Sequence, residues 1–280
     1  MRIHNILYPT TFPPVDEIAF VHALKLVLSV EGALSILHLD PIGSLEEHFH
    51  YPDIRRTLVK WGILKENGEY GDDQPSKFQV CTSVVKDKSP MHALANHLAC
   101  HKADLMVLTT RKQSGLGRLH SPSLSNLAAG KTVAMTLFLP EGARGFVESE
   151  KGGFKLNHIL VPVDHDPPSG QALKAVKFLQ RFGDPNSIKI TLLHVSDGTR
   201  PFPDNHPYPE NWKRDIVAKT KSGSEHIVEF ARNNEVDCIA MATAGRHGLF
   251  DAIMGSTTEQ VLRHAPCPVL AVNAFLAEQL

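Results

Sequence analysis

An internal repeat restricts the fold of this chain more than any other feature of its sequence. Residues 5–11 read Asn-Ile-Leu-Tyr-Pro-Thr-Thr, and residues 158–164 read His-Ile-Leu-Val-Pro-Val-Asp. Both are short apolar runs ending near a proline, which is typical of a buried strand followed by a turn. Because 280 residues suffice for two domains with separate cores, we expect one domain type twice, in residues 1–145 and 154–280.

Both copies continue with the same order of expected elements. Apolar residues recur at helical spacing after each opening strand, at Ile18, Val21, Leu24 and Leu28 and at Ala172, Leu173, Val176 and Leu179. The later strands expected in the two copies pair off as 34–39 with 190–195, 104–108 with 237–241, and 133–139 with 269–272. Strands that alternate with helices predict parallel pairing through right-handed crossovers. The expected fold class is α/β, with two doubly wound parallel-sheet, Rossmann-like α/β sandwich domains in tandem.

The copies differ between their second strand and the strand that begins with Asp. The first copy has an insert over residues 40–76, with Trp61 and an expected helix over 53–66. The second has a proline-rich loop over residues 200–209, where repeated prolines exclude regular structure. Glycines and charges predict a linker between the copies, over residues 140–153.

Composition narrows the class of protein. The net charge of −1 argues against a general nucleic-acid binder, and no apolar run approaches the roughly 20 residues of a membrane span. We find no signal-peptide pattern at the amino terminus and expect a cytoplasmic protein with no membrane partner. The four cysteines, Cys81, Cys100, Cys238 and Cys267, lie in apolar segments and are expected to be buried thiols.

Residues 241–258 leave an expected strand, cross a glycine-containing loop and enter an expected helix. Ligands bind at such junctions in doubly wound sheets, and a helix N-terminus suits a phosphate group. Gly255 permits close approach of the backbone, and Ser256, Thr257 and Thr258 offer hydroxyl groups. A second interpretation fits these residues equally well: the glycines only turn the chain, and Ser256 only caps the helix.

The loop resembles the signature of the universal stress protein superfamily, which is Gly, two residues, Gly, nine residues, and then Gly-Ser or Gly-Thr. Gly245, Gly255 and Ser256 match this spacing, whereas Ala242 stands at the first glycine position. Residues 159–164 and 261–270 also resemble the first strand and the last helix and strand of that family. The repeat extends the resemblance over nearly the whole chain.

The resemblance implies an ATP site in the second copy. Asp164 would contact the nucleoside, with Pro162 and Val163 lining its pocket and Val195 beside the adenine. Met241 and Ala242 would flank the base and ribose. The phosphates would be held by Gly245, Gly255, Ser256 and Thr257, with Thr258 close by.

The first copy departs further from the signature. Thr109 and Lys112 replace the first two glycines, Pro122 replaces the last, and Thr11 stands where Asp164 stands. Proline has no N–H group to offer a phosphate, so we expect this half not to bind ATP in the usual way. The basic residues Arg111, Lys112 and Arg118 are interpreted as a solvated loop, with an anion site as the less favoured alternative.

Other candidate sites are weaker. His48 and His50 beside Glu46 and Glu47, and Asp204 with His206, have the donor types of a zinc site but no metal-binding spacing. His38 and His194 occupy equivalent places, for which packing or hydrogen bonding is favoured over catalysis. His165 and Asp166 either face the mouth of the site or only form its turn.

The expected function is therefore ATP binding through the second domain, in a regulatory or stress-response role. No catalytic base is identifiable, so we expect no enzyme activity beyond slow, incidental ATP hydrolysis. The family resemblance implies pairing of the two halves through their final strands, and a homodimer of chains. The alternatives are a protein that binds zinc or a non-nucleotide ligand through the first domain's insert, and an enzyme that transfers a phosphoryl or adenylyl group from ATP.

Overall fold

The computed structural model describes most of the 280-residue chain. The described residues are 3–10, 17–40, 52–67, 78–110, 135–184, 187–203, 207–243 and 256–275. None of the helices in these ranges is both long enough and apolar enough to cross a membrane.

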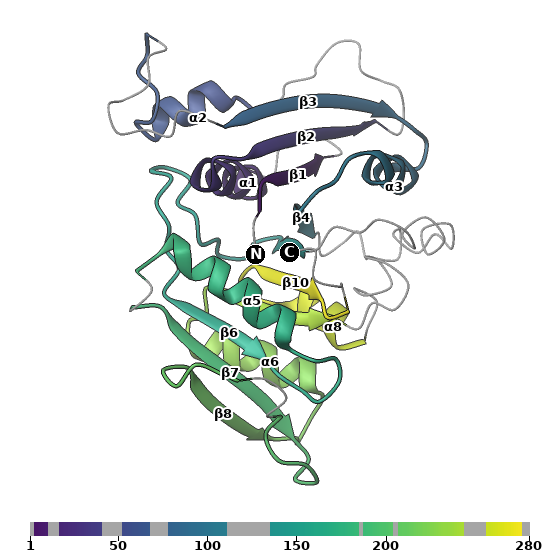
Figure 1. The fold of residues 1–280 in the computed structure, drawn as a ribbon, viewed down its shortest axis with the longest axis vertical. Coiled ribbons are helices and arrows are strands. Elements are labelled where there is room, and N and C mark those ends of the chain that lie inside the picture. The colour runs from purple at the N-terminus through teal and green to yellow at the C-terminus, as the bar shows by residue number, and fades with distance from the viewer. Residues whose placement is uncertain are drawn as a thin grey trace.

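Two repeats of alternating strands and helices follow each other along the chain (Figure 1). The first repeat consists of β1 (Asn5–Thr10), α1 (Glu17–Val30), β2 (Ala33–Asp40), α2 (Ile54–Lys60), β3 (Gln79–Lys86), α3 (Pro90–Cys100), β4 (Leu105–Thr110) and β5 (Met135–Pro140). The second consists of β6 (His158–Pro162), α5 (Gly170–Leu179), η2 (Gln180–Phe182), β7 (Lys189–Ser196), β8 (Lys213–Ala218), α6 (Gly223–Asn233), β9 (Cys238–Thr243), α8 (Ser256–His264) and β10 (Val269–Asn273).

All of these strands belong to a single 10-stranded sheet, in the order β3-β2-β1-β4-β5-β10-β9-β6-β7-β8. Within each repeat the described pairings are parallel. The repeats join where β5 pairs with β10 in antiparallel orientation, from Val269↔Phe138 to Val272↔Met135. The carboxyl ends of the parallel strands therefore point to opposite edges of the sheet in the two repeats.

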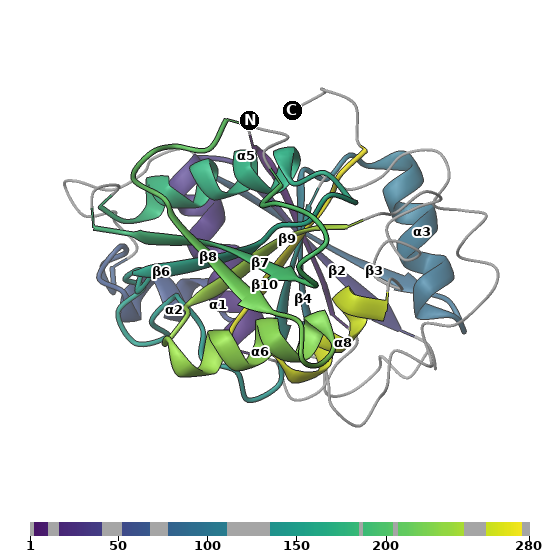
Figure 2. The same cartoon turned by 90° about the horizontal axis from the view of Figure 1, so that it is seen from below.

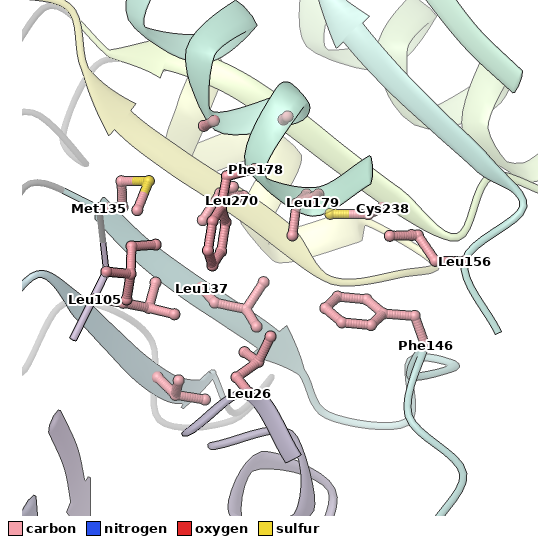
Figure 3. Close-up of a cluster of buried hydrophobic side chains, with 14 of the residues drawn as sticks. Leu26, Leu105, Met135, Leu137, Phe146, Leu156, Phe178, Leu179, Cys238 and Leu270 are labelled. Carbon is pink, nitrogen blue, oxygen red and sulfur yellow. The ribbon is translucent and has the colours of Figure 1, made fainter. Parts of the chain in front are cut away.

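Helices cover both faces of this sheet, and α5 and α6 lie on opposite sides of the strands of the second repeat (Figure 2). The core beneath α1 and α5 is continuous across the boundary between the repeats. It brings Leu26 of α1, Leu137 of β5, Leu270 of β10 and Phe178 of α5 into one cluster (Figure 3). The two repeats thus share one hydrophobic core on this face.

Each repeat has an Asp directly before its fourth strand, and this residue binds the start of the first strand. Asp104 Oδ2 accepts hydrogen bonds from the backbone N–H groups of His4 (2.9 Å) and Asn5 (2.8 Å). Asp237 Oδ2 accepts the equivalent bonds from Asn157 (2.8 Å) and His158 (3.0 Å). Each carboxylate therefore ties the start of the fourth strand to the start of the first.

The segment between the repeats packs against both of them. Its Phe146 is fully buried, and the N–H groups of Phe146 and Val147 donate to Nε2 of His22 in α1, at 3.0 and 3.2 Å. The chain then turns back through a bridge between Val147 and Phe154. The Phe154 ring stacks on Phe182 of the second repeat, with centroids 5.0 Å apart. The predicted linker therefore does connect the repeats, and part of it is packed against both of them.

The helix in the first insert is shorter than expected. It spans Ile54–Lys60 instead of residues 53–66, with Asp53 as its N-cap. Gly62 has a φ of +69°, and the N–H of Ile63 bonds back to Leu58, which closes the helix. The Trp61 indole N–H donates to the Ser149 carbonyl at 2.9 Å, so this insert is attached to the segment between the repeats.

Two of the four cysteines contradict the expectation of buried thiols. Cys238 and Cys267 are buried, and burial raises the pKa of both, to about 12 for Cys267. Cys81 and Cys100 are exposed. Cys81 lies in β3, which pairs with β2 alone among the described strands and has exposed positions on both faces. Cys100 is the last residue of α3. The edge strands β3 and β8 have no fully buried position, and the sequence interpretation missed both.

Gly152 provides a test of this packing. Its φ is +63°, and an added Cβ would lie 2.4 Å from the Trp61 ring. We expect Gly152→Ala to lower the free energy of unfolding by about 2–4 kcal/mol, through backbone strain and overpacking together. Gly142→Ala is the matched control, because Gly142 has a φ of +75° and nothing within 4 Å of the added Cβ. Equal losses for both variants in denaturant unfolding would contradict the packing role of Gly152.

His22 predicts loss of stability in acid. Burial lowers the pKa of its imidazole from 6.5 to about 4, against the opposing effect of the hydrogen bond from Nδ1 to the Ile18 carbonyl. The unfolded chain therefore binds the proton more readily between these values, and stability falls as the pH falls through this window. From pH 7 to pH 5, we expect wild type to lose about 2 kcal/mol more unfolding free energy than His22→Gln.

The matched control is His264→Gln, which replaces an exposed histidine whose Nδ1 also bonds a carbonyl of its own helix. Between pH 7 and pH 5, this control should lose the same unfolding free energy as wild type. If wild type and His22→Gln lost the same unfolding free energy between these pH values, the neutral His22 imidazole would not be what holds the segment between the repeats.

Candidate functional site

The candidate site of the second repeat lies where the parallel strands β6, β7 and β9 end. Strand order reverses between β6 and β9, because the chain proceeds from β6 to β7 and β8 on one side and to β10 on the other. In the described chain, β6 and β9 pair only at Ile159↔Cys238 and Leu160↔Ile239. Both strands continue beyond these pairs toward their carboxyl ends, so the sheet divides there. Such a division is where doubly wound sheets bind ligands.

The turn after β6 presents an exposed carboxylate. Pro162 ends the strand and is half-buried, and Val163 is buried with its N–H bonded to the Leu193 carbonyl at 2.9 Å. Asp164 is exposed, and its Oδ1 accepts the N–H of His165 at 2.8 Å. The backbone before Asp164 is thus held to β7 while the carboxylate stays open to solvent.

The neighbouring strands place three further expected residues at the same edge. Val195 is half-buried near the end of β7. Met241 and Ala242 lie near the end of β9, paired with Ala271 and Val272 of β10. Met241 is buried in the core beneath α6 and α8, whereas Ala242 is half-buried on the opposite face. The fold therefore places Asp164, Val195 and Ala242 at the carboxyl edge shared by β6, β7 and β9.

The helix that follows the loop begins at Ser256. It connects two parallel strands, β9 and β10, so its N-terminus lies at their carboxyl edge. Thr257 is exposed there, and Thr258 is buried at 5% exposure. Gly245 and Gly255 lie outside the described residues, so the loop itself stays a prediction.

The proline-rich loop contributes an aromatic cluster that the sequence interpretation missed. His194 Nδ1 donates to the Val163 carbonyl at 3.1 Å, and its ring meets Phe202 edge-to-face at 5.9 Å. Phe202 meets Tyr208 in the same way at 5.8 Å, and the Arg214 guanidinium lies over both rings. Phe202 and Tyr208, which lie among the prolines, were the sequence signal from which this cluster could have been predicted. The bond to Val163 agrees with the hydrogen-bonding role expected for His194.

The equivalent edge of the first repeat carries different chemistry. Burial lowers the pKa of His38 to about 4, while the charge of Asp40 and a hydrogen bond to the Thr10 backbone act in the opposite direction. Asp40 is itself buried, where the second repeat has the half-buried Ser196. Thr109 is half-buried at the end of β4. Thr11, the basic loop with Arg111, Lys112 and Arg118, and Pro122 lie outside the described residues.

The candidate zinc ligands lie outside the described part of the chain, so the zinc alternative stays a prediction. They are Glu46, Glu47, His48 and His50, together with Asp204 and His206. Within the described ranges, no three His, Cys, Asp or Glu residues are grouped so that they could hold a metal ion.

Comparison with known proteins agrees with this architecture. A universal stress protein of Methanocaldococcus jannaschii is 40% identical over 66 residues, which are 23% of this chain and 39% of that protein. The crystal structure of a universal stress protein from Archaeoglobus fulgidus superimposes with a TM-score of 0.58 at 17% identity, over 96% of each chain. A protein of unknown function from Pseudomonas aeruginosa matches with a TM-score of 0.54 at 17% identity, over 97% of this chain and 92% of that one. The two structural matches support the fold alone.

The family itself is shown by a sequence match that extends over both repeats. The model of the universal stress protein family matches residues 2–132 and 210–273 of the chain. These ranges contain the first repeat from β1 to β4 and the second repeat from β8 to β10. Together with the paired α/β repeats, the match shows that this chain belongs to the universal stress protein family, with two such domains in tandem.

Proposed function

We propose that the chain binds ATP through its second repeat and serves a regulatory, stress-response role without being an enzyme. The observation that carries this proposal is the division of the sheet between β6 and β9, bordered by Asp164 on one side and followed by α8 on the other. A nucleoside fits the strand ends, where Asp164 offers an exposed acceptor. The phosphates fit the N-terminus of α8, where N–H groups and the helix dipole favour an anion.

The site residues divide between these two ends of the nucleotide. Pro162, Val163, Asp164, Val195, Met241 and Ala242 belong to the nucleoside end, and Gly245, Gly255, Ser256, Thr257 and Thr258 to the phosphate end. The half-buried Ala242 adds one methyl group where the family has glycine, on a strand whose pairing with β10 is regular through Asn273. The methyl group is thus compatible with the regular pairing of β9 and β10.

The described histidines at this edge support binding rather than catalysis. His165 Nε2 lies 3.1 Å from the Pro201 carbonyl, and His194 Nδ1 lies 3.1 Å from the Val163 carbonyl. A carbonyl oxygen only accepts, so both rings donate and hold loops in place. Turnover of ATP faster than a few per hour that is abolished by Asp164→Ala would contradict the non-enzymatic proposal.

Asp164→Ala tests the nucleoside end. Loss of a charged hydrogen-bond acceptor should weaken ATP binding by roughly tenfold or more, measured by calorimetry on the intact chain. Asp166→Ala is the matched control, since it removes the same charge from an exposed residue of the same turn. Removing a negative charge near a polyphosphate should leave affinity equal or higher in the control. An equal effect of both variants would contradict a specific contact at Asp164.

Gly255→Val tests the phosphate end. The branched side chain should block close approach of the backbone to the phosphates and remove detectable ATP binding. Gly223→Val is the control, because Gly223 begins α6 and has nothing within 4 Å of an added Cβ. Unchanged ATP affinity in Gly255→Val would show that the phosphate site lies elsewhere.

A further inference from the structure

We infer that His165 is a positioning residue for the nucleoside end of the proposed site, acting by tying the turn that carries Asp164 to the proline-rich loop. The inference rests on the proposed function, because it concerns the same ATP site. It goes beyond that function in giving a role to a residue outside the glycine signature and to the loop that most distinguishes the second repeat from the first.

His165 connects two segments that are far apart in the sequence. Its backbone N–H donates to Asp164 Oδ1 at 2.8 Å, which orients the carboxylate toward its own turn. Its ring Nε2 lies 3.1 Å from the carbonyl oxygen of Pro201, 36 residues later. Since the carbonyl only accepts, the ring carries its proton on Nε2. One residue therefore holds the carboxylate and anchors the turn to the loop.

The loop side of this connection is itself held in place. The Tyr208 hydroxyl donates to the Pro203 carbonyl at 2.7 Å, and Tyr208 is buried. The Phe202 ring lies edge-to-face against both Tyr208 and His194. Prolines at 201 and 203 further restrict the backbone. The Pro201 carbonyl is therefore a stationary acceptor to which the turn is attached.

The path of the chain places this anchor beside the nucleoside end. The loop leaves β7 at Ser196, at the carboxyl edge of the sheet, and returns to the opposite edge to enter β8 at Lys213. Pro201 and Phe202 come early in this crossover. His165 and His194 also meet edge-to-face, with ring centroids 5.8 Å apart. The turn that carries Asp164, the end of β7 and the start of the loop thus form one connected network.

The network acts on the nucleoside and not on the phosphates. His165 bonds to Asp164 and to Pro201, whereas the proposed phosphate groups belong to the loop after β9 and to α8. Removal of the His165 ring leaves the Asp164 side chain present but releases its turn from the loop. Removal of the ring should therefore weaken the binding of nucleotide and leave unchanged the binding of a ligand that has phosphates alone.

The test uses the full chain with ATP and with inorganic tripolyphosphate, which has the phosphates but no nucleoside. ATP affinity is measured by calorimetry, and tripolyphosphate affinity by competition against ATP. His165→Ala should weaken ATP binding by roughly three- to tenfold, the effect of one hydrogen bond, and leave tripolyphosphate affinity unchanged. His165→Gln places an amide N–H near the position of Nε2 and should bind ATP within about twofold of wild type.

His101→Ala is the matched control, because His101 is an exposed histidine of the first repeat whose Nδ1 lies 3.1 Å from the His97 carbonyl. Thermal unfolding of each variant shows whether the fold is retained. Unchanged ATP affinity in His165→Ala would overturn the inference and leave the proposed function standing. An equal loss for both ligands, or no recovery in His165→Gln, would also overturn it. No ATP binding by wild type would overturn both.

Discussion

The antiparallel pairing of β5 with β10 is the interaction on which the rest of this structure depends. Each repeat alone would expose the backbone groups of its final strand along an open sheet edge. Pairing of Met135 to Phe138 with Val269 to Val272 satisfies these groups and joins two five-stranded sheets into one. Leu137 and Leu270 then lie in one core with α1 and α5. The packed segment around Phe146 adds a second connection between the repeats.

The antiparallel junction also separates the two potential ligand sites, because it directs the carboxyl ends of the two repeats to opposite edges. Each edge can therefore change without steric conflict with the other. The second repeat keeps an exposed Asp164 beside a network of His165, His194 and Phe202. The first repeat has the buried pair His38 and Asp40 at the corresponding strand end. A duplicated domain has thus acquired two chemically different edges.

Much of the fold was predictable because its buried elements have strong patterns. The strands around Ile6 and Ile159 and the helices around Leu24 and Val176 are apolar at regular spacing, which burial on the sheet requires. The edge strands β3 and β8 lack such a pattern, since only one neighbour and little of the core constrain them. For the same reason Cys81 is exposed. For the proposed site, Asp164 and Ala242 were predicted from the family resemblance, whereas the bond between His165 and Pro201 joins residues too distant for any local pattern.

The sequence by itself determined the repeat, the α/β class, the family signature and the asymmetry between a near-complete and a degenerate loop. These follow from local residue types and spacings, which the chain carries wherever it folds. Pairing of the halves through their final strands was already implied by the family resemblance. Only the tertiary structure decided the antiparallel register of β5 on β10, the bonds of His22 to the segment at Phe146, and the contact of the proline-rich loop with the turn after β6. Those contacts join residues dozens to more than a hundred positions apart. Their geometry depends on packing of the whole core, and no local spacing encodes it.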